Sequence, residues 1–300
     1  MTGGQPRVIV GVDGSQHSAA ALAWAATDAQ LRGTRLTVIT AYGRNTPRPE
    51  PGGTAPAPPE GTEQACRDMQ ARLLRGRPAS ASPEVTSLVL PGDPVKLLTR
   101  AADTDDVLVV GTRGRSPLRS LLLGSVAQGC TERAPCPVVV IPAAGHLPTG
   151  QDAHRPVVAG VDPSPEARAA LRFAAGEATL RGVPLLPVHA VYPDYASTHA
   201  ARADPAGDNE LLPPLDSAWA QLDTLIHSEL AGATVTTQPI AVCGDPGQIL
   251  LSWSESAALI AVGTRGTGRL HAALLGSVSS HLVRHSHCPV AVIPSWPASP

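Results

Sequence analysis

An internal repeat constrains the fold more than any other feature of this chain. The segment PRVIVGVDGS at positions 6–15 returns as PVVAGVDPS at 156–164, with Asp162 lying 149 residues after Asp13. CPVVVIP at 136–142 returns as CPVAVIP at 288–294, an offset of 152 residues. A period near 150 residues indicates a duplicated domain and not a solenoid. We therefore expect one domain over residues 1–143 and a second over 155–300, with a short linker between them.

Each copy alternates short β-branched runs with helix-like segments. In the first copy the runs at 7–12, 36–42, 84–90, 106–110 and 137–141 indicate strands. Segments at 15–31, 64–75, 94–102 and 125–133 indicate the helices between them. Strands of this kind suit a parallel sheet that is covered on both faces. The alternation predicts an α/β fold, with an open parallel sheet and helices on both of its sides.

A glycine pattern follows the fourth expected strand of both copies. Residues 111–125 read GTRGRSPLRSLLLGS and residues 263–277 read GTRGTGRLHAALLGS, with identical glycine spacing. Glycine allows unusual backbone angles, and without Cβ it lets the main chain approach a ligand closely. The N–H groups of such a turn and of the next helix start suit phosphate oxygens. We predict a phosphate-binding loop in each copy; the alternative is a glycine turn followed by an ordinary Ser-capped helix.

Composition and charge exclude several classes of protein. The net charge is −2 and Lys/Arg residues form no tract, which disfavours nucleic acid as a partner. Lys96 is the only lysine, so a Walker-type P-loop with Gly-Lys-Ser/Thr is absent. No apolar run has membrane-spanning length, and the sequence shows no signal-peptide pattern. We expect a cytoplasmic protein whose five cysteines are reduced thiols.

The repeated motifs together resemble those of the universal stress protein family. They are GVDGS at 11–15, GDP at 92–94, the spacing G-x2-G-x9-G-S, and the final CPVxVIP strand. The resemblance covers both halves and matches the tandem-domain type. It implies two Rossmann-like domains (adenine nucleotide alpha hydrolase-like), each a five-stranded parallel sheet of order 3-2-1-4-5. It also implies that ATP, with Mg²⁺, binds at the carboxyl ends of the strands.

The resemblance assigns roles to matching residues in both halves. The acidic residue after the first strand is expected near the ribose and the metal. The backbone of the second strand is expected to bind the adenine edge. The glycine loop and the start of the next helix are expected to bind the phosphates. In the first half these residues are Asp13, Gly14, Ser15, Ala41, Gly111, Arg113, Gly114, Gly124, Ser125 and Val126. In the second half they are Asp162, Ser164, Ala190, Gly263, Arg265, Gly266, Gly276, Ser277 and Val278. Pro163 replaces Gly14 and lacks an N–H, so we expect the second site to be weaker.

The function implied is that of an ATP-binding, stress-response regulatory protein that acts as a nucleotide-dependent sensor or switch. No residue reads as a dedicated nucleophile or general base, so we expect no enzymatic role. Two alternatives remain: a slow Mg²⁺-dependent ATP hydrolase, and an interaction scaffold with vestigial nucleotide sites. The apolar final strands at 138–141 and 290–293 would be exposed edges. They predict an internal pseudo-dimer, and a homodimer is a further option; the sequence names no protein partner.

Several histidines permit two interpretations. His281 and His285 share a helix face, and Cys288 follows them, but no further ligand stands at a metalloprotease spacing. We therefore favour a surface or interface role over a zinc site. His189, in the second strand of the second half, faces either adenine or the core, and the sequence does not decide between them.

Acidic residues outside the motifs have simpler explanations. Asp93 and Asp245 lie in GDP turns, where they are expected to cap the following helices. The cluster Asp103, Asp105 and Asp106 is expected to form a solvated loop and not a metal site.

Overall fold

A computed structural model gives the structure of residues 5–43, 60–75, 83–112, 114, 123–142, 154–192, 214–266 and 275–294. The chain forms two compact units, Met1–Ala144 and Gly145–Pro300, which are described separately. The predicted pairing between the two copies stays a prediction. Among the described helices, none combines the length and the apolar character needed to span a bilayer.

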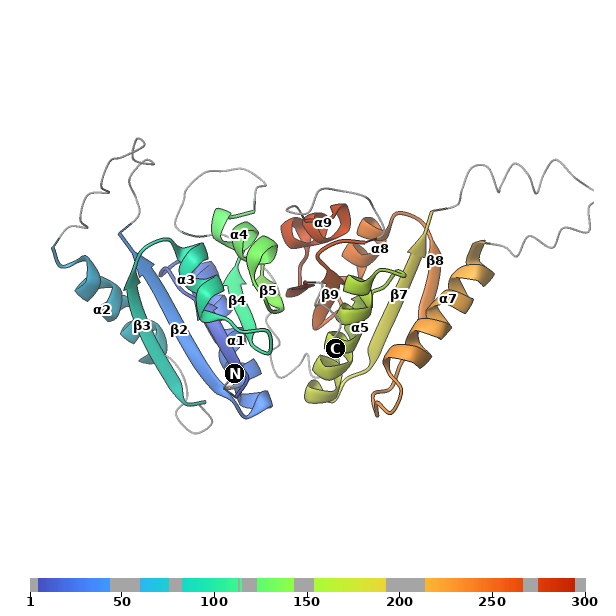
Figure 1. Ribbon diagram of the computed structural model, residues 1–300, viewed down its shortest axis with the longest axis horizontal. Helices are drawn as coiled ribbons and strands as arrows, with labels where there is room; N and C mark the ends of the chain where they lie inside the picture. The colour runs from blue at the N-terminus through green and yellow to red at the C-terminus, as the bar shows by residue number, and fades with distance from the viewer. Residues whose placement is uncertain are drawn as a thin grey trace, which may run out of the picture. The chain divides into compact units, whose positions relative to one another are not determined.

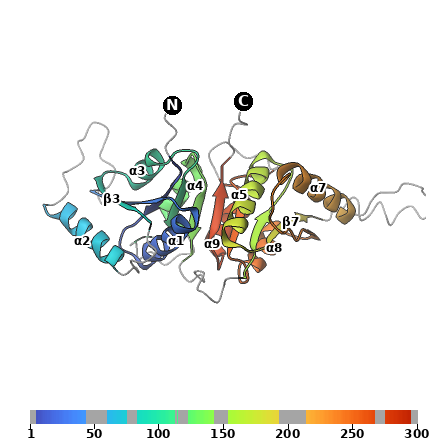
Figure 2. The ribbon, with the colours of Figure 1, turned by 90° about the horizontal axis from the view of Figure 1, so that it is seen from below.

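The first unit is a five-stranded parallel sheet flanked by helices (Figure 1). Its strands lie in the order β3-β2-β1-β4-β5, which confirms the predicted topology. The strands are β1 (Arg7–Gly11), β2 (Arg35–Tyr42), β3 (Val85–Pro91), β4 (Val107–Gly111) and β5 (Val138–Ile141). The helices are α1 (Gln16–Arg32), α2 (Thr62–Arg75), α3 (Pro94–Ala101) and α4 (Ser125–Arg133). Helices α1 and α2 cover one face of this sheet, and α3 and α4 cover the other (Figure 2).

The second unit repeats this arrangement. Its parallel strands lie in the order β8-β7-β6-β9-β10, the same topology read from the sheet's other end. The strands are β6 (Val157–Gly160), β7 (Leu185–Val191), β8 (Ile240–Cys243), β9 (Leu259–Gly263) and β10 (Val290–Ile293). The helices are α5 (Pro165–Arg181), α7 (Pro214–Glu229), α8 (Pro246–Trp253) and α9 (Ser277–His285).

The last two strands of each unit are buried and aliphatic. All residues of β5 and β10 and the first four of β4 and β9 are buried, as β-branched runs covered on both faces require. The long helices α1 and α5 end at Gly33 and Gly182, whose φ angles of 62° and 65° are left-handed. Glycine adopts this conformation without a Cβ penalty, so both helices stop at the same point of the repeat.

The expected solvated loop at Asp103–Asp106 is wrong for Asp106. Its side chain is only 3% exposed, and its Oδ2 lies 2.7 Å from Nη2 of Arg7. The backbone N–H of Arg7 also donates to Oδ1 of Asp106 at 2.8 Å. Because β1 and β4 are neighbours in the sheet, the start of one strand meets the loop before the other. Asp106 is therefore a structural ion-pair partner.

The five cysteines are free, as expected for reduced thiols. Burial raises the pKa of Cys130 and of Cys136 to about 12, and that of Cys288 to about 11. These three thiols stay protonated at neutral pH, and buried protonated thiols are poor nucleophiles.

Candidate functional site

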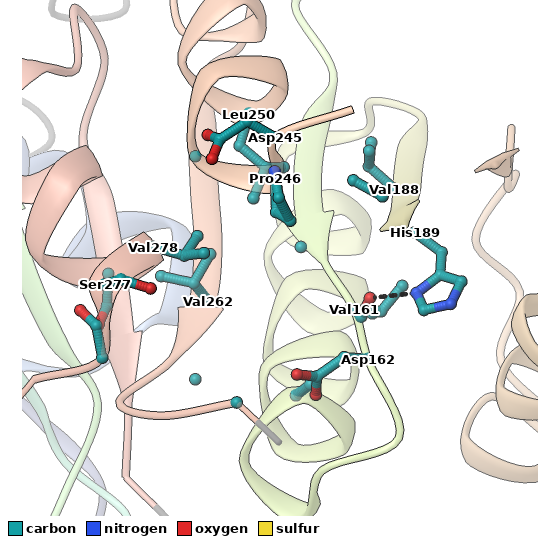
Figure 3. Close-up of a pocket in the computed structure, with 18 of the residues that line it drawn as sticks. Val161, Asp162, Val188, His189, Asp245, Pro246, Leu250, Val262, Ser277 and Val278 are labelled. Carbon is teal, nitrogen blue, oxygen red and sulfur yellow. Dashed lines mark hydrogen bonds between the residues drawn. The ribbon is translucent and has the colours of Figure 1, made fainter. Parts of the chain in front are cut away.

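A cleft of about 870 Å³ opens at the carboxyl ends of the strands in the second unit. Figure 3 shows residues from the ends of β6, β7 and β9 and from the starts of α8 and α9 around it. This is the edge at which open α/β sheets hold their ligands. Eight of the nine residues predicted for this half line the cleft: Asp162, Ala190, Gly263, Arg265, Gly266, Gly276, Ser277 and Val278. The ninth, Ser164, is buried and caps α5 by accepting a hydrogen bond from Ala167 N.

The second glycine of each loop lies directly against the predicted acidic residue. A Cβ added to Gly114 would stand 2.6 Å from Oδ2 of Asp13, and one added to Gly266 would collide with Oδ2 of Asp162 in the same way. The other carboxylate oxygen, Oδ1, accepts the N–H of the residue two positions on: 3.0 Å in the first unit and 2.9 Å in the second. The structure thus brings the glycine loop and the aspartate together in both units.

The first glycine of each loop has a packing role that the sequence analysis did not foresee. A Cβ on Gly111 would stand 2.9 Å from the backbone of His17 in the first turn of α1. A Cβ on Gly263 would stand 2.6 Å from Cβ of Glu166, in the first turn of α5. None of the loop glycines at 111, 114, 263 and 266 has a left-handed φ angle. Space, and not an unusual backbone angle, is what requires glycine here.

The helix starts at the cleft differ from other helix starts in the chain. Helices α1, α3, α5 and α8 are capped by the side chains of Ser15, Asp93, Ser164 and Asp245, which confirms the capping role predicted for the two aspartates. Helices α4 and α9 instead start at glycines 124 and 276, which have no side chain to cap with. Their first-turn N–H groups therefore remain suited to an external acceptor such as a phosphate.

The predicted residues of the first unit lie in the elements that correspond to those around the cleft of the second unit. Ala41 lies near the end of β2, Ser15 caps α1, and Ser125 and Val126 begin α4. Arg113 lies outside the described residues, so its predicted contact with phosphate stays a prediction.

The expected weakening by Pro163 has lost its physical basis. The N–H of Gly14, which was expected to serve the ligand, donates to Oγ of Ser18 at 3.1 Å. The residue equivalent to Ser18 in the second unit is Ala167, which has no hydroxyl. Pro163 therefore lacks a donor only where the matching acceptor is also missing. The predicted difference in affinity between the two sites stays a prediction.

His189 lies in the core at the edge of the cleft. The residue is 4% exposed, and its Nδ1–H donates to the carbonyl oxygen of Val161 at 2.7 Å (Figure 3). Val188 points to the opposite face of β7. The hydrogen bond ties the end of β7 to the loop after β6, which is a structural role for this histidine.

The sequence analysis did not place Tyr192, Asp245 or His281 in the wall of the cleft. Tyr192, just after β7, donates a hydrogen bond to Oδ2 of Asp245. That bond lowers the pKa of Asp245. His281 of α9 also lines the cleft. Only the position of Tyr192 at the end of a strand could have signalled this placement.

The histidine pair of α9 has no metal-like setting. The rings of His281 and His285 are 4.9 Å apart between centroids and tilted by 42°. In the described part of the chain, no three His, Cys, Asp or Glu side chains gather as a metal-ion site would need.

Comparison with known proteins identifies the family. The model of the universal stress protein family matches residues 6–142 and 153–294. Universal stress protein Rv2005c of Mycobacterium tuberculosis is 32% identical over 306 residues, covering 96% of this chain and 97% of that protein. Universal stress protein Rv2623 of the same organism is 30% identical, covering 95% of each chain.

A solved structure shows the same architecture over nearly the whole chain. A universal stress protein from Archaeoglobus fulgidus covers 98% of this chain and all of its own, with a TM-score of 0.65 and 20% identity. Two more solved universal stress proteins, one in complex with cAMP and one from A. fulgidus in complex with dAMP, align over 46% and 47% of this chain and 97% and 98% of their own. Both are 25% identical, with TM-scores of 0.35 and 0.34.

The family model matches nearly the whole length of the chain in two successive segments, and the curated relatives are at least 30% identical end to end. The chain therefore belongs to the universal stress protein family, with two of the family's domains in tandem.

Proposed function

We propose that each unit binds an adenine nucleotide, with ATP and Mg²⁺ as the ligand, and that nucleotide occupancy makes the chain a sensor or switch in a stress response. The observation that carries this proposal is the cleft of the second unit. There the uncapped start of α9, the glycine loop and the carboxylate of Asp162 share one space. A volume of about 870 Å³ lies within the usual range for small-molecule sites.

The lining of the cleft suits the parts of a nucleotide. Val161, Val188, Val262 and Leu250 offer apolar surface to a base, as most ligand sites do (Figure 3). The start of α9 and Arg265 offer positive potential to phosphates. Mg²⁺ binds through one or two carboxylates together with phosphate oxygens, and Asp162 and its counterpart Asp13 would supply the carboxylate. The bound ion would neutralise phosphate charge beside that carboxylate.

We further propose that binding and not turnover is the role of these sites. The oxygen Oδ1 of Asp162 already accepts hydrogen bonds from the backbone and side chain of Ser164, which suits a carboxylate that organises the loop. A slow Mg²⁺-dependent hydrolase remains the alternative. It predicts phosphate release that is faster than in buffer and lost with the binding site.

The test is to place a methyl group where the loop meets the aspartate. Gly114→Ala and Gly266→Ala, singly and together, displace the carboxylate in one or both units. Each should weaken Mg-ATP binding to its own unit by at least about tenfold in calorimetry, because a charged contact is lost. Gly176→Ala is the matched control, since a Cβ at Gly176 meets no heavy atom within 4 Å.

Two outcomes would count against the proposal. ATP affinity that is unchanged in the double glycine variant would mean that the site lies elsewhere. Equal affinity for ATP and GTP in the parent protein would contradict adenine as the base. Phosphate release that is equal in the parent and the double variant would exclude the hydrolase alternative.

A further inference from the structure

The helix pair α3–α4 and the helix pair α8–α9 each meet through one glycine and one larger side chain. The glycine lies on the second helix in the first unit and on the first helix in the second unit. In the first unit, a Cβ added to Gly129 of α4 would stand 2.7 Å from Cγ2 of Val95 in α3. The equivalent residues of the second unit are His281 and Gly247, and a Cβ on Gly247 would stand 3.3 Å from Cδ2 of His281. The bulky side chain has thus moved from the first helix of the pair to the second. The helix contact is kept, as volume-conserving exchanges allow.

The exchange replaces a valine by an imidazole in the wall of the cleft. Gly247 and His281 both line it, together with Ser277 and Val278 of the uncapped first turn of α9. His281 stands one turn after Ser277, and helical side chains lean toward the N-terminus of their helix. The imidazole therefore lies close to the start of α9, where the proposed function places the phosphates.

The groups around His281 determine how its charge responds to a ligand. Asp245, the N-cap residue of α8, is the negative charge that acts on the ring, and Tyr192, just after β7, donates to that aspartate. His285 of α9 has its ring centroid 4.9 Å away, and Arg265 of the loop after β9 lines the same cleft. Gln248 of α8 is neutral, and its amide N–H donates to Nε2 of His281 at 3.3 Å, which leaves Nδ1 as the ring nitrogen that carries the proton in this contact. An anionic ligand would add to the effect of Asp245 and favour the imidazolium.

We propose that His281 is a phosphate-binding residue of the second cleft, one that the first unit lacks because Gly129 stands in its place. The inference rests on the proposed function, since it takes nucleotide phosphates to lie at the start of α9. An imidazolium donates a charge-assisted hydrogen bond to phosphate and a neutral ring donates a weaker one. Nucleotide binding to the second unit should therefore tighten as pH falls through the range in which imidazole titrates, and weaken as pH rises through it.

The experiment measures Mg-ATP binding to the full chain by calorimetry at about pH 8 and about pH 5.5, on either side of the imidazole range. The parent is Gly114→Ala, in which only the second unit binds. The first test variant adds Gly247→Val and His281→Gly, which rebuilds the residue pair of the first unit and so should pack. The second test variant adds His281→Gln alone, which keeps a polar side chain that cannot gain a proton.

The parent should bind Mg-ATP about tenfold more tightly at the lower pH, the size expected for one charge-assisted hydrogen bond. In both test variants the change in affinity between the two pH values should be smaller. Only the part that comes from protonation of the nucleotide's own phosphates should remain, and this part is the same for all three proteins. Adenosine, which carries no phosphate, should show no pH dependence attributable to His281.

Pairwise comparison separates this inference from the proposed function. If the parent binds Mg-ATP and both test variants show the same pH profile as the parent, His281 does not bind phosphate and only this inference fails. If the parent binds no Mg-ATP at either pH, the proposed function of the second unit fails, and this inference fails with it.

Discussion

The two units differ at the loop after their first strand, both in the backbone conformation of one residue and in the contacts that hold the loop. In the first unit Gly14, with a φ angle of 84°, donates its N–H to Oγ of Ser18 at 3.1 Å. In the second unit Pro163 and Ala167 occupy these positions, so the donor and the acceptor have disappeared together. The aspartate before this position keeps the same hydrogen bond in both units. The comparison teaches that the halves have diverged by paired changes around an unchanged carboxylate.

A second paired change lies at the opposite end of the strands. Arg7 and Asp106 form an ion pair with an Nη2–Oδ2 distance of 2.7 Å, and the N–H of Arg7 also donates to Asp106. The equivalent residues of the second unit are Pro156 and Ala258, which have neither the charges nor that N–H. The N–H of Ala258 donates to the carbonyl of Pro156 at 2.9 Å. An ion pair in one unit is thus replaced by a backbone contact in the other.

Breaking that ion pair from one side should have the largest effect. Asp106→Ala leaves the guanidinium of Arg7 without its main partner, while its residual bonds to Ala101 and Asp103 and its partial exposure soften the loss. We expect the free energy of unfolding of the first unit to fall by about 2–3 kcal/mol. Amide hydrogen exchange in β1 and β4 measures it, with β6 and β9 as the internal reference.

The matched variant introduces the equivalent residues of the second unit, proline and alanine, into the first unit. Arg7→Pro combined with Asp106→Ala removes both charges and the orphaned N–H, so it should be less destabilising than Asp106→Ala alone. A double variant at least as unstable as the single one would show that the two ends of the repeat are not interchangeable.

The alternation of strands and helices could be predicted because its signals are local and repeated. Short β-branched runs, glycine stops and helix caps each act within a few residues, and their return after about 150 residues predicted two parallel sheets. The strand order came from the family resemblance, and the structure confirms it. The resemblance assigned the glycine loop and an aspartate, Asp13 or Asp162, to one site in each half, and the structure brings them together.

What the sequence could not show depends on contacts between distant segments. Asp106 seemed to be solvated because its partner, Arg7, is 99 residues away and becomes its neighbour only through the pairing of β1 with β4. The N–H of Gly14 seemed to be available because residue types alone do not reveal which hydroxyl it meets. Helical periodicity put His281 on a helix, but only the packing of α9 against α8 shows that it lines the cleft.

The loop after β1 should tolerate the paired exchange better than a single change. Gly14→Pro forces a residue with φ near −65° into a position at 84° and removes the N–H that meets Ser18, so the first unit should lose about 1–2 kcal/mol. Gly14→Pro with Ser18→Ala rebuilds the pair of the second unit and should recover part of that loss. Urea unfolding of the full chain measures both effects.

The ATP affinity of the double variant Gly14→Pro, Ser18→Ala tests whether the N–H of Gly14 binds the ligand. Because the N–H of Gly14 is engaged within the protein, the double variant should bind ATP in the first unit within about threefold of the parent, far less than the loss of a ligand hydrogen bond. A drop of about tenfold or more, measured in a Gly266→Ala background, would show that this N–H does serve the ligand and would restore the expected asymmetry.

The smallest expected effect concerns the contact between α5 and α7. Glu229 accepts hydrogen bonds from Arg168, with an N–O distance of 2.9 Å, and from Arg172. The equivalent positions in α1 of the first unit are Ala19 and Ala23. Burial alone would raise the pKa of Glu229, but the two arginines outweigh it and the pKa is lowered. A depressed carboxyl pKa stabilises the fold above the unfolded-state pKa of about 4.3, and that contribution is lost as pH falls through the folded-state pKa.

Acid should therefore loosen the packing of α7 in the second unit. The two arginine side chains are 39% and 51% exposed, so solvent screens the pair and we expect less than about 1 kcal/mol at neutral pH. Glu229→Gln should remove that contribution at pH 7 and change little below about pH 3.5, where the parent carboxyl is also protonated. Hydrogen exchange of α7 amides at both pH values measures it. Equal destabilisation at both pH values would mean that Glu229 contributes by packing and not by charge.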